Sequence, residues 1–192
     1  MSLPLHPLAR QSLLTPNDAV RYMWEIGQLN EALKLLECIE TVCSKSSSLE
    51  SLEVARIYVN RGSVLSTLNR YDEAGELFDK ALQIRSKLLK ENDPLLANSY
   101  MQMGNYLTSR GRFEEAVKSH LRVIDIRTRT LETPVGIMTI SYFNLCRSLL
   151  MGNRLDEAEV YLKKAEDLEP TMKERERFQY MSEWVSPYAH EP

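Results

Sequence analysis

The sequence predicts an all-α protein, a solenoid of antiparallel helix pairs, and two observations carry this prediction. Four similar segments, QLNEA, RYDEA, RFEEA and RLDEA, recur along the 192 residues with their alanines 42 residues apart. After each segment the apolar residues recur at helical spacing, so one face of each predicted helix is apolar. A fixed internal period in this range is typical of a helical-repeat protein. The alanines are Ala32, Ala74, Ala116 and Ala158.

A second column marks where the helices of each pair separate. Gly27, Asn69, Gly111 and Asn153 precede the four segments at the same 42-residue interval. Glycine and asparagine tolerate the left-handed backbone conformation that ends a helix. The column therefore predicts a tight turn at each of the four positions.

Small residues form further columns, and we expect them to let paired helices approach closely. Gly62, Gly104 and Cys146 share one repeat position, and the four alanines share another. Tyr58, Tyr100 and Tyr142 recur in the same way, and we interpret them as packing residues between helices. One helix pair cannot bury its apolar face alone, so the pairs are expected to stack.

Helix starts are predicted at three sites where a capping residue precedes proline. These are Thr15-Pro16, Asp93-Pro94 and Thr133-Pro134. The side chain of a capping residue accepts from the free N–H groups of the first turn, and proline tolerates that turn. A glutamate column early in the second helices is interpreted as structural, because acids stabilise a helix N-terminus. Its members are Glu31, Glu73, Glu115 and Glu157.

The pattern of Tyr58, Gly62, Ala74, Phe78 and Ala81 resembles the tetratricopeptide repeat. The usual unit has 34 residues, whereas this one has 42, and it is similar to the kinesin-light-chain type. The resemblance implies a right-handed superhelix. We expect an N-terminal extension at 1–14 and four repeats at 15–170, followed by a capping helix and tail at 171–192. The repeats are predicted at 15–51, 52–93, 94–133 and 134–170, and the capping helix at 172–185.

Arrays of this repeat type also resemble the C-terminal part of large signalling NTPases. The chain contains no P-loop, so this second resemblance concerns only the context in which the array would act.

The family resemblance implies that the first helix of each pair lines a concave groove. Carboxamides both donate and accept hydrogen bonds, so they can bind the main chain of an extended peptide, and arginines can add bonds to acidic side chains. The alternative is that these polar residues are solvated or bond to neighbouring helices. The predicted peptide-binding residues are Arg56, Asn60, Ser63, Asn98, Gln102, Asn105, Asn144 and Arg147.

One known variant of such a groove, a clamp for a C-terminal carboxylate, is not expected. The clamp needs lysines on the first helices, and Val59, Met101 and Phe143 occupy the corresponding positions.

Catalytic, metal and cofactor sites are not predicted. His6, His120 and His190 have no partners at metal-ligand spacing, and His120 falls on the apolar side of its helix. Cys38 and Cys43 do not share a helix face. No nucleophile–base motif or glycine-rich phosphate loop occurs. We therefore predict that the chain is not an enzyme and binds no cofactor.

Charge and composition also limit the classes of partner and the cellular location that we expect. The net charge is −3, and the basic stretch of Arg122, Arg127 and Arg129 lacks interleaved aromatic residues, so nucleic-acid binding is not expected. No apolar run reaches the roughly 18 residues that span a membrane. The N-terminus lacks the features of a signal peptide, and three scattered cysteines favour a reducing compartment. We expect a cytoplasmic location.

These observations predict a protein–protein interaction module that binds an extended or helical peptide in its groove. The alternative is an assembly element that self-associates as a homo-oligomer or packs against other domains of a longer chain. An exposed apolar patch at Phe143, Leu150 and Met151 would favour that alternative.

Overall fold

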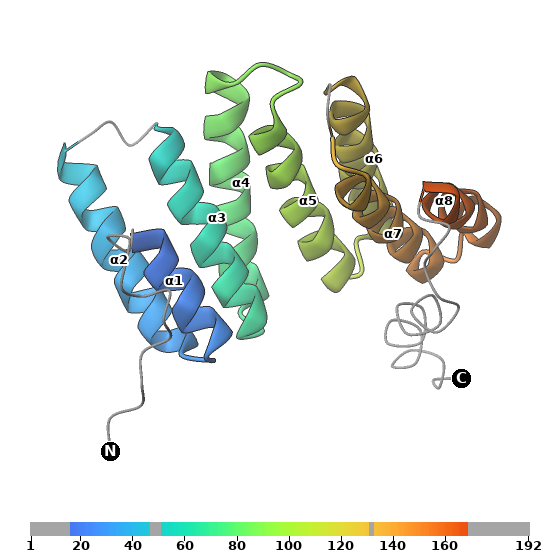
Figure 1. Ribbon diagram of the computed structural model, residues 1–192. Coiled ribbons are helices and arrows are strands. Elements are labelled where there is room, and N and C mark those ends of the chain that lie inside the picture. Colours follow the sequence, from blue (N-terminus) through green and yellow to red (C-terminus); the bar gives the residue numbers. More distant parts are fainter. Residues whose placement is uncertain (1–15, 47–50, 131–132, 169–192) are drawn as a thin grey trace, which may run out of the picture. The chain divides into compact units, whose positions relative to one another are not determined.

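The computed structural model describes residues 16–46, 51–130 and 133–168, and every regular element in these ranges is an α-helix (Figure 1). The extension predicted at 1–14 and the capping helix predicted at 172–185 lie outside the described residues. The helices are α1 (Pro16–Glu25), α2 (Leu29–Ser46), α3 (Leu52–Thr67), α4 (Tyr71–Leu88), α5 (Pro94–Ser109), α6 (Phe113–Arg129), α7 (Val135–Met151) and α8 (Leu155–Leu168).

The chain divides into two compact units, residues 1–81 and 82–192, and the boundary falls inside α4. In the first unit α1 packs against α2, and α2 packs against α3. In the second unit α5 packs against α6, α6 against α7, and α7 against α8. Consecutive helices thus form neighbouring pairs, and the predicted α-solenoid architecture is confirmed. The division into four repeats at the boundaries given above stays our interpretation of this pairing.

The turns inside the helix pairs occur where the glycine and asparagine column predicted them. The backbone angle φ is +76° at Gly27, +60° at Asn69, +72° at Gly111 and +58° at Asn153. The residue after each of these donates its N–H to a carbonyl five positions earlier, as Arg112 does to Leu107 at 2.9 Å. This bond satisfies a carbonyl that the helix end would leave free.

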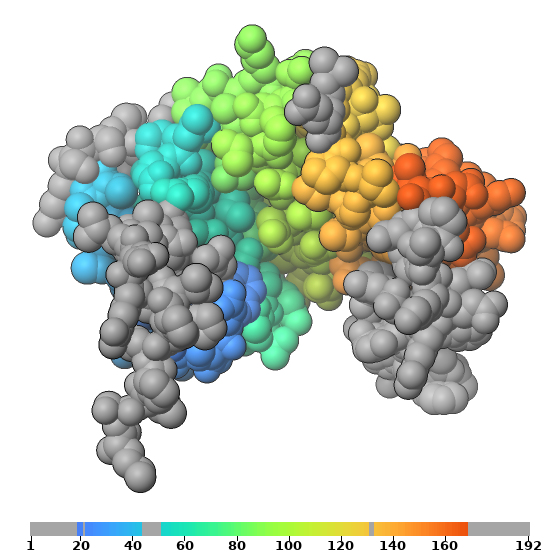
Figure 2. Space-filling model, viewed as in Figure 1, coloured from blue at the N-terminus to red at the C-terminus, as the bar shows by residue number. Residues whose placement is uncertain are grey.

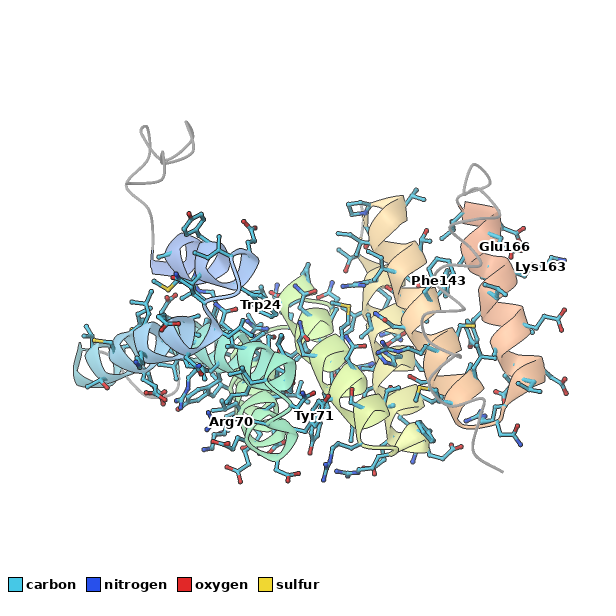
Figure 3. All side chains as sticks on the ribbon, turned by 90° about the horizontal axis from the view of Figure 1, so that it is seen from below. Trp24, Arg70, Tyr71, Phe143, Lys163 and Glu166 are labelled. Atoms are coloured by element: carbon cyan, nitrogen blue, oxygen red, sulfur yellow. The ribbon has the colours of Figure 1, made fainter. Side chains whose placement is uncertain are left out.

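Arginine–glutamate pairs begin three of the second helices. Arg70 donates from Nε and from a terminal nitrogen to the two carboxylate oxygens of Glu73, both at 2.6 Å, and Arg70 lies at the start of α4 (Figure 3). Arg112 and Arg154 bond Glu115 and Glu157 in the same manner. The hydrogen bond from Arg70 holds the pKa of Glu73 below its usual range. The glutamate column therefore has ion-pair partners at the turns.

The small-residue columns are close-packing positions. All four alanines of the repeated segments are at most 1% exposed. A Cβ atom at Gly62 would lie 2.6 Å from the Phe78 ring, and one at Gly104 would lie 2.6 Å from the His120 ring. Phe78 and His120 occupy equivalent repeat positions, 42 residues apart. A ring on the second helix therefore fits against a glycine on the first.

The core of the second unit is built from the facing sides of consecutive helices. The space-filling view shows α7 and α8 in direct contact (Figure 2). Between α6, α7 and α8 lies a buried cluster of Val117, Leu145, Cys146, Leu149 and Ala158. A second cluster joins α5 to α6 through Leu96, Ala97, Val123 and Ile126. Each helix thus buries residues against the next, as a stacked array requires.

Of the three predicted helix caps, one is confirmed, one is wrong, and the one at Thr15 lies outside the described residues. Asp93 accepts a bond from the Leu95 N–H at 2.8 Å, with Pro94 in the first turn of α5. Thr133 does not cap α7, which begins at Val135 without a side-chain cap. Its hydroxyl instead donates to the Arg127 carbonyl at 2.8 Å, at the end of α6. Thr133 therefore serves the helix that ends before it, because the carbonyls there also need partners.

Buried arginines join each second helix to the first turns of the next helix in the second unit. Arg85 on α4 donates to the Leu95 carbonyl at 2.9 Å and to the Ser99 hydroxyl at 2.8 Å. Forty-two residues later, Arg127 on α6 donates to the Ile137 carbonyl at 3.1 Å and to the Ser141 hydroxyl at 2.6 Å. Both arginines are less than 10% exposed, so their charges are solvated mainly by these acceptors.

We expect Ala116→Leu to destabilise the protein by about 1–3 kcal/mol, because Ala116 is fully buried and a larger side chain overpacks the contact. The measurement is the free energy of unfolding in urea. Lys118→Leu is the control, since Lys118 is exposed on the same helix. An Ala116→Leu protein as stable as its parent would show that the alanine column is not closely packed.

Candidate interaction surface on the first helices

In the first unit, the predicted binding residues form one polar stripe along α3. Arg56, Asn60 and Ser63 are spaced four and three residues apart, so they share a helix face. Arg56 is exposed and forms an ion pair with Glu53 one turn earlier. Asn60 and Ser63 are half-buried. The structure thus brings these three residues onto one side of α3.

In the second unit, the corresponding stripe on α5 consists of Asn98, Gln102 and Asn105. Asn98 is exposed, and Gln102 and Asn105 are half-buried. On α7 the equivalent positions carry Asn144, which is 9% exposed, and Arg147, which is half-buried. The two helices contact one another, so both stripes belong to neighbouring first helices of one unit.

The stripes on α5 and α7 are joined by a hydrogen bond between two predicted site residues. A terminal nitrogen of Arg147 donates to the Asn105 side-chain oxygen at 2.9 Å. The two residues are 42 positions apart and hold the same place in consecutive repeats. Burial lowers the pKa of the Arg147 guanidinium. The pair is therefore a partly desolvated cation held by a carboxamide.

Arg127 is a contributor to this surface that the sequence analysis missed. It reaches from α6 and donates to the Asn98 side-chain oxygen at 3.1 Å, in addition to its bonds at the start of α7. A signal existed, because Arg85 and Arg127 recur 42 residues apart together with Ser99 and Ser141. By its sequence neighbours alone, Arg127 belongs to a local basic stretch with Arg122 and Arg129.

The rest of that basic stretch is paired with acids. Arg122 forms ion pairs with Asp125 at 2.6 Å and Glu91 at 3.7 Å. Arg129 forms an ion pair with the same Asp125 at 2.7 Å. Since Arg127 is buried, the stretch offers little unpaired positive charge to a phosphate backbone.

The apolar residues near the α7 stripe are largely covered. Phe143 on α7 (Figure 3) is 6% exposed, and Leu150 and Met151 are half-buried. Exposed aromatic residues occur instead on α1, where Tyr22 is 52% and Trp24 is 38% exposed. The condition that would favour self-association through Phe143 is therefore not met.

His120 lies beneath the α5 stripe, against Gly104, and is 1% exposed. Its Nε2 atom is buried and has no hydrogen-bond partner. Burial, assisted by the positive charge of Arg147, lowers the pKa of His120 to about 3. The imidazole is therefore neutral at physiological pH and packs as a buried ring against Gly104, on the apolar side of its helix as the sequence indicates.

The described part of the chain holds no candidate metal site and no candidate membrane-spanning helix. Within it, no group of three or more His, Cys, Asp or Glu side chains could hold a metal ion. None of the eight helices is both long and apolar enough to cross a membrane. A pocket of about 310 Å³ opens at the turn before α6, between Phe113 and Gly152, and none of the stripe residues lines it.

A match to a family model identifies the protein family that the repeat geometry indicates. The model for the tetratricopeptide repeat matches residues 19–87 and 53–129. The chain belongs to the tetratricopeptide repeat family. Repeats of this family are protein-interaction scaffolds. A comparison with curated proteins finds no significant match.

Solved structures share the tetratricopeptide fold at low sequence identity. BtubC (BKLC) from P. vanneervenii matches with a TM-score of 0.76 and 19% identity over 82% of this chain and 63% of its own. A putative kinesin light chain from Podosopora anserina, with nearly identical TPR-like repeats, gives 0.76 and 20% over 91% and 84%. The apo form of RapI gives 0.71 and 15% over 94% and 71%. The likeness to kinesin-light-chain repeats confirms the predicted repeat type.

The depressed pKa of His120 predicts a loss of stability in acid. The unfolded chain binds a proton at this residue below about pH 6.5, whereas the folded protein resists it down to about pH 3. The contribution of His120 to the free energy of unfolding is therefore constant above about pH 6.5. As the pH falls from 6.5 to 3, it decreases by up to about 1.4 kcal/mol per pH unit. We expect His120→Phe to remove this contribution, because Phe78 already fills the equivalent position against Gly62.

The measurement is the free energy of unfolding of parent and variant in urea between pH 4 and pH 7. Protonation of the carboxylates changes the free energy of unfolding of both proteins equally. The difference between the two curves therefore gives the contribution of His120. Parallel curves over this range would contradict the prediction.

Proposed function

We propose that this protein is a non-catalytic interaction module, in which the first helices of the repeats within each unit bind an extended peptide segment of a partner protein. The binding residues would be Arg56, Asn60, Ser63, Asn98, Gln102, Asn105, Asn144 and Arg147. The single observation that supports this most directly is the joined stripe of the second unit, where Arg147 and Asn105 meet at equivalent repeat positions.

The chemistry of that stripe suits the main chain of a peptide. Gln102 lies between Asn98 and Asn105 and is half-buried. Among the described residues, no hydrogen bond involves its carboxamide, so both ends of that group are available to a ligand. Peptide groups offer donors and acceptors at regular intervals, which a row of carboxamides can match with little dependence on side chains. Arg147 would add a preference for acidic ligands.

Self-association is the second candidate, and the first candidate has more support. An assembly surface of the expected kind would expose Phe143, which is 6% exposed. Light scattering of the pure protein separates the two functions, because an interaction module is expected to be monomeric without its partner. A stable oligomer that covers the α5 and α7 stripes would favour assembly.

We expect Gln102→Ala to weaken the binding of a native partner by about 1–3 kcal/mol, since a hydrogen-bonding group of the partner would lose its counterpart. Asn144→Ala should have a similar effect. The partner is recovered by crosslinking from native extract, and its affinity is then measured by calorimetry for the parent and for both variants. Affinity should also fall as salt rises, because the arginines contribute charge.

Gln28→Ala is the matched control, because Gln28 is an exposed carboxamide in the turn before α2. It should bind like the parent. Melting curves check that Asn144→Ala still folds, since that side chain is mostly buried. Unchanged affinity in both stripe variants would show that the interface does not lie on the first helices.

A further inference from the structure

Two asparagines on the α5 stripe are each held by an arginine from another helix. Arg127 of α6 donates to Asn98 at 3.1 Å, and Arg147 of α7 donates to Asn105 at 2.9 Å. A guanidinium has only donors, so the carboxamide atom that faces it must be the oxygen. The orientation of both carboxamides therefore follows from their partners and does not depend on how oxygen and nitrogen are assigned.

The amide nitrogens of both side chains are left for a ligand. Within the described residues, neither Asn98 nor Asn105 donates a side-chain hydrogen bond, and Asn98 is exposed while Asn105 is half-buried. The two residues are seven positions apart, which is two helical turns or about 10.5 Å along one face of α5. Gln102, whose carboxamide has no such partner, lies between them. The stripe therefore offers fixed donors at both ends and an adaptable group in the middle.

We infer that Arg127 and Arg147 are positioning residues that make Asn98 and Asn105 fixed hydrogen-bond donors, so that this stripe selects extended, acidic peptides rich in acceptors. The inference rests on the proposed function and specifies its ligand. A freely rotating carboxamide can turn either end to a ligand, whereas one held by a guanidinium cannot. Main-chain carbonyls and carboxylates satisfy such donors, and a lysine-rich segment would leave its own donors without acceptors there.

Two synthetic peptides serve as probes. The acidic probe is an acetylated and amidated dodecapeptide of alternating Glu and Pro, and the neutral probe replaces every Glu by Gln. Proline favours an extended left-handed conformation and has no N–H, so both probes are rich in acceptors. Titration into the ¹⁵N-labelled protein is followed through the side-chain amide signals. We expect signals of Asn98 and Asn105 to shift, and the acidic probe to bind at least about fivefold more tightly than the neutral one.

Asn98→Asp and Asn105→Asp test the donors directly. Aspartate keeps an oxygen for the arginine but has no N–H to donate, so the fold should be retained while the ligand loses a bond. We expect each variant to bind either probe about fivefold more weakly. A loss with the neutral probe cannot come from charge repulsion. Asn30→Asp, at an exposed position on α2, makes the same change of net charge elsewhere and should bind like the parent.

Arg127→Met tests the positioning role. Without the guanidinium, the Asn98 carboxamide can turn, and the preference for the acidic over the neutral probe should fall toward equality. Asn105, which is still held by Arg147, should shift as in the parent, which distinguishes lost positioning from a damaged fold. An unchanged preference in a folded Arg127→Met protein would overturn the role of Arg127.

The remaining outcomes separate this inference from the proposed function. If the probes shift Gln102 while both aspartate variants bind like the parent, the donors are not used and the inference fails, although the groove still binds peptide. If neither probe shifts any amide of the α5 and α7 stripes, the stated ligand class is wrong. The proposed function is then judged separately by the effect of Gln102→Ala on the native partner.

Discussion

A buried guanidinium that links three helices is the interaction on which the second unit depends. Arg127 extends from α6, donates hydrogen bonds to the first turns of α7, and donates another to the side chain of Asn98 on α5. A buried cation is costly unless its donors are satisfied, so the helices must keep the spacing that supplies those acceptors. A single side chain thereby contributes both to the stacking of one repeat on the next and to the orientation of a surface carboxamide.

Features that depend on local backbone conformation were predictable from the sequence. The left-handed residues, from Gly27 to Asn153, follow from residue type and from a period that no insertion interrupts. The alanine column was predictable for the same reason, because a position that recurs as a small residue in every repeat indicates a close contact. Residue type and periodicity are sufficient where the physical cause lies within one helix pair.

Features that depend on the reach of long side chains were not predicted. The cap expected at Thr133 failed because the hydroxyl has two helix ends within reach and bonds the earlier one. The sequence pattern indicates a surface position for Arg127, since a basic stretch is usually solvated and the sequence does not show where the end of a flexible side chain lies. The stripes themselves were predicted by resemblance to the family, but their mutual bond between Asn105 and Arg147 requires the distance between two helices.

The bond between a buried arginine on one helix and a serine on the next also determines how the array can be lengthened. The arginine at 85 or 127 always meets a serine, at 99 or 141, whereas the first repeat carries Cys43 and the second repeat Ile57 at these positions. A duplicate of the 42-residue unit that begins at Asp93, inserted in register, would place each arginine opposite a serine. A duplicate of the first repeat at the same point would set Cys43 opposite Ser99. The 42-residue unit that begins at Asp93 is therefore the module from which longer versions of this protein can be engineered.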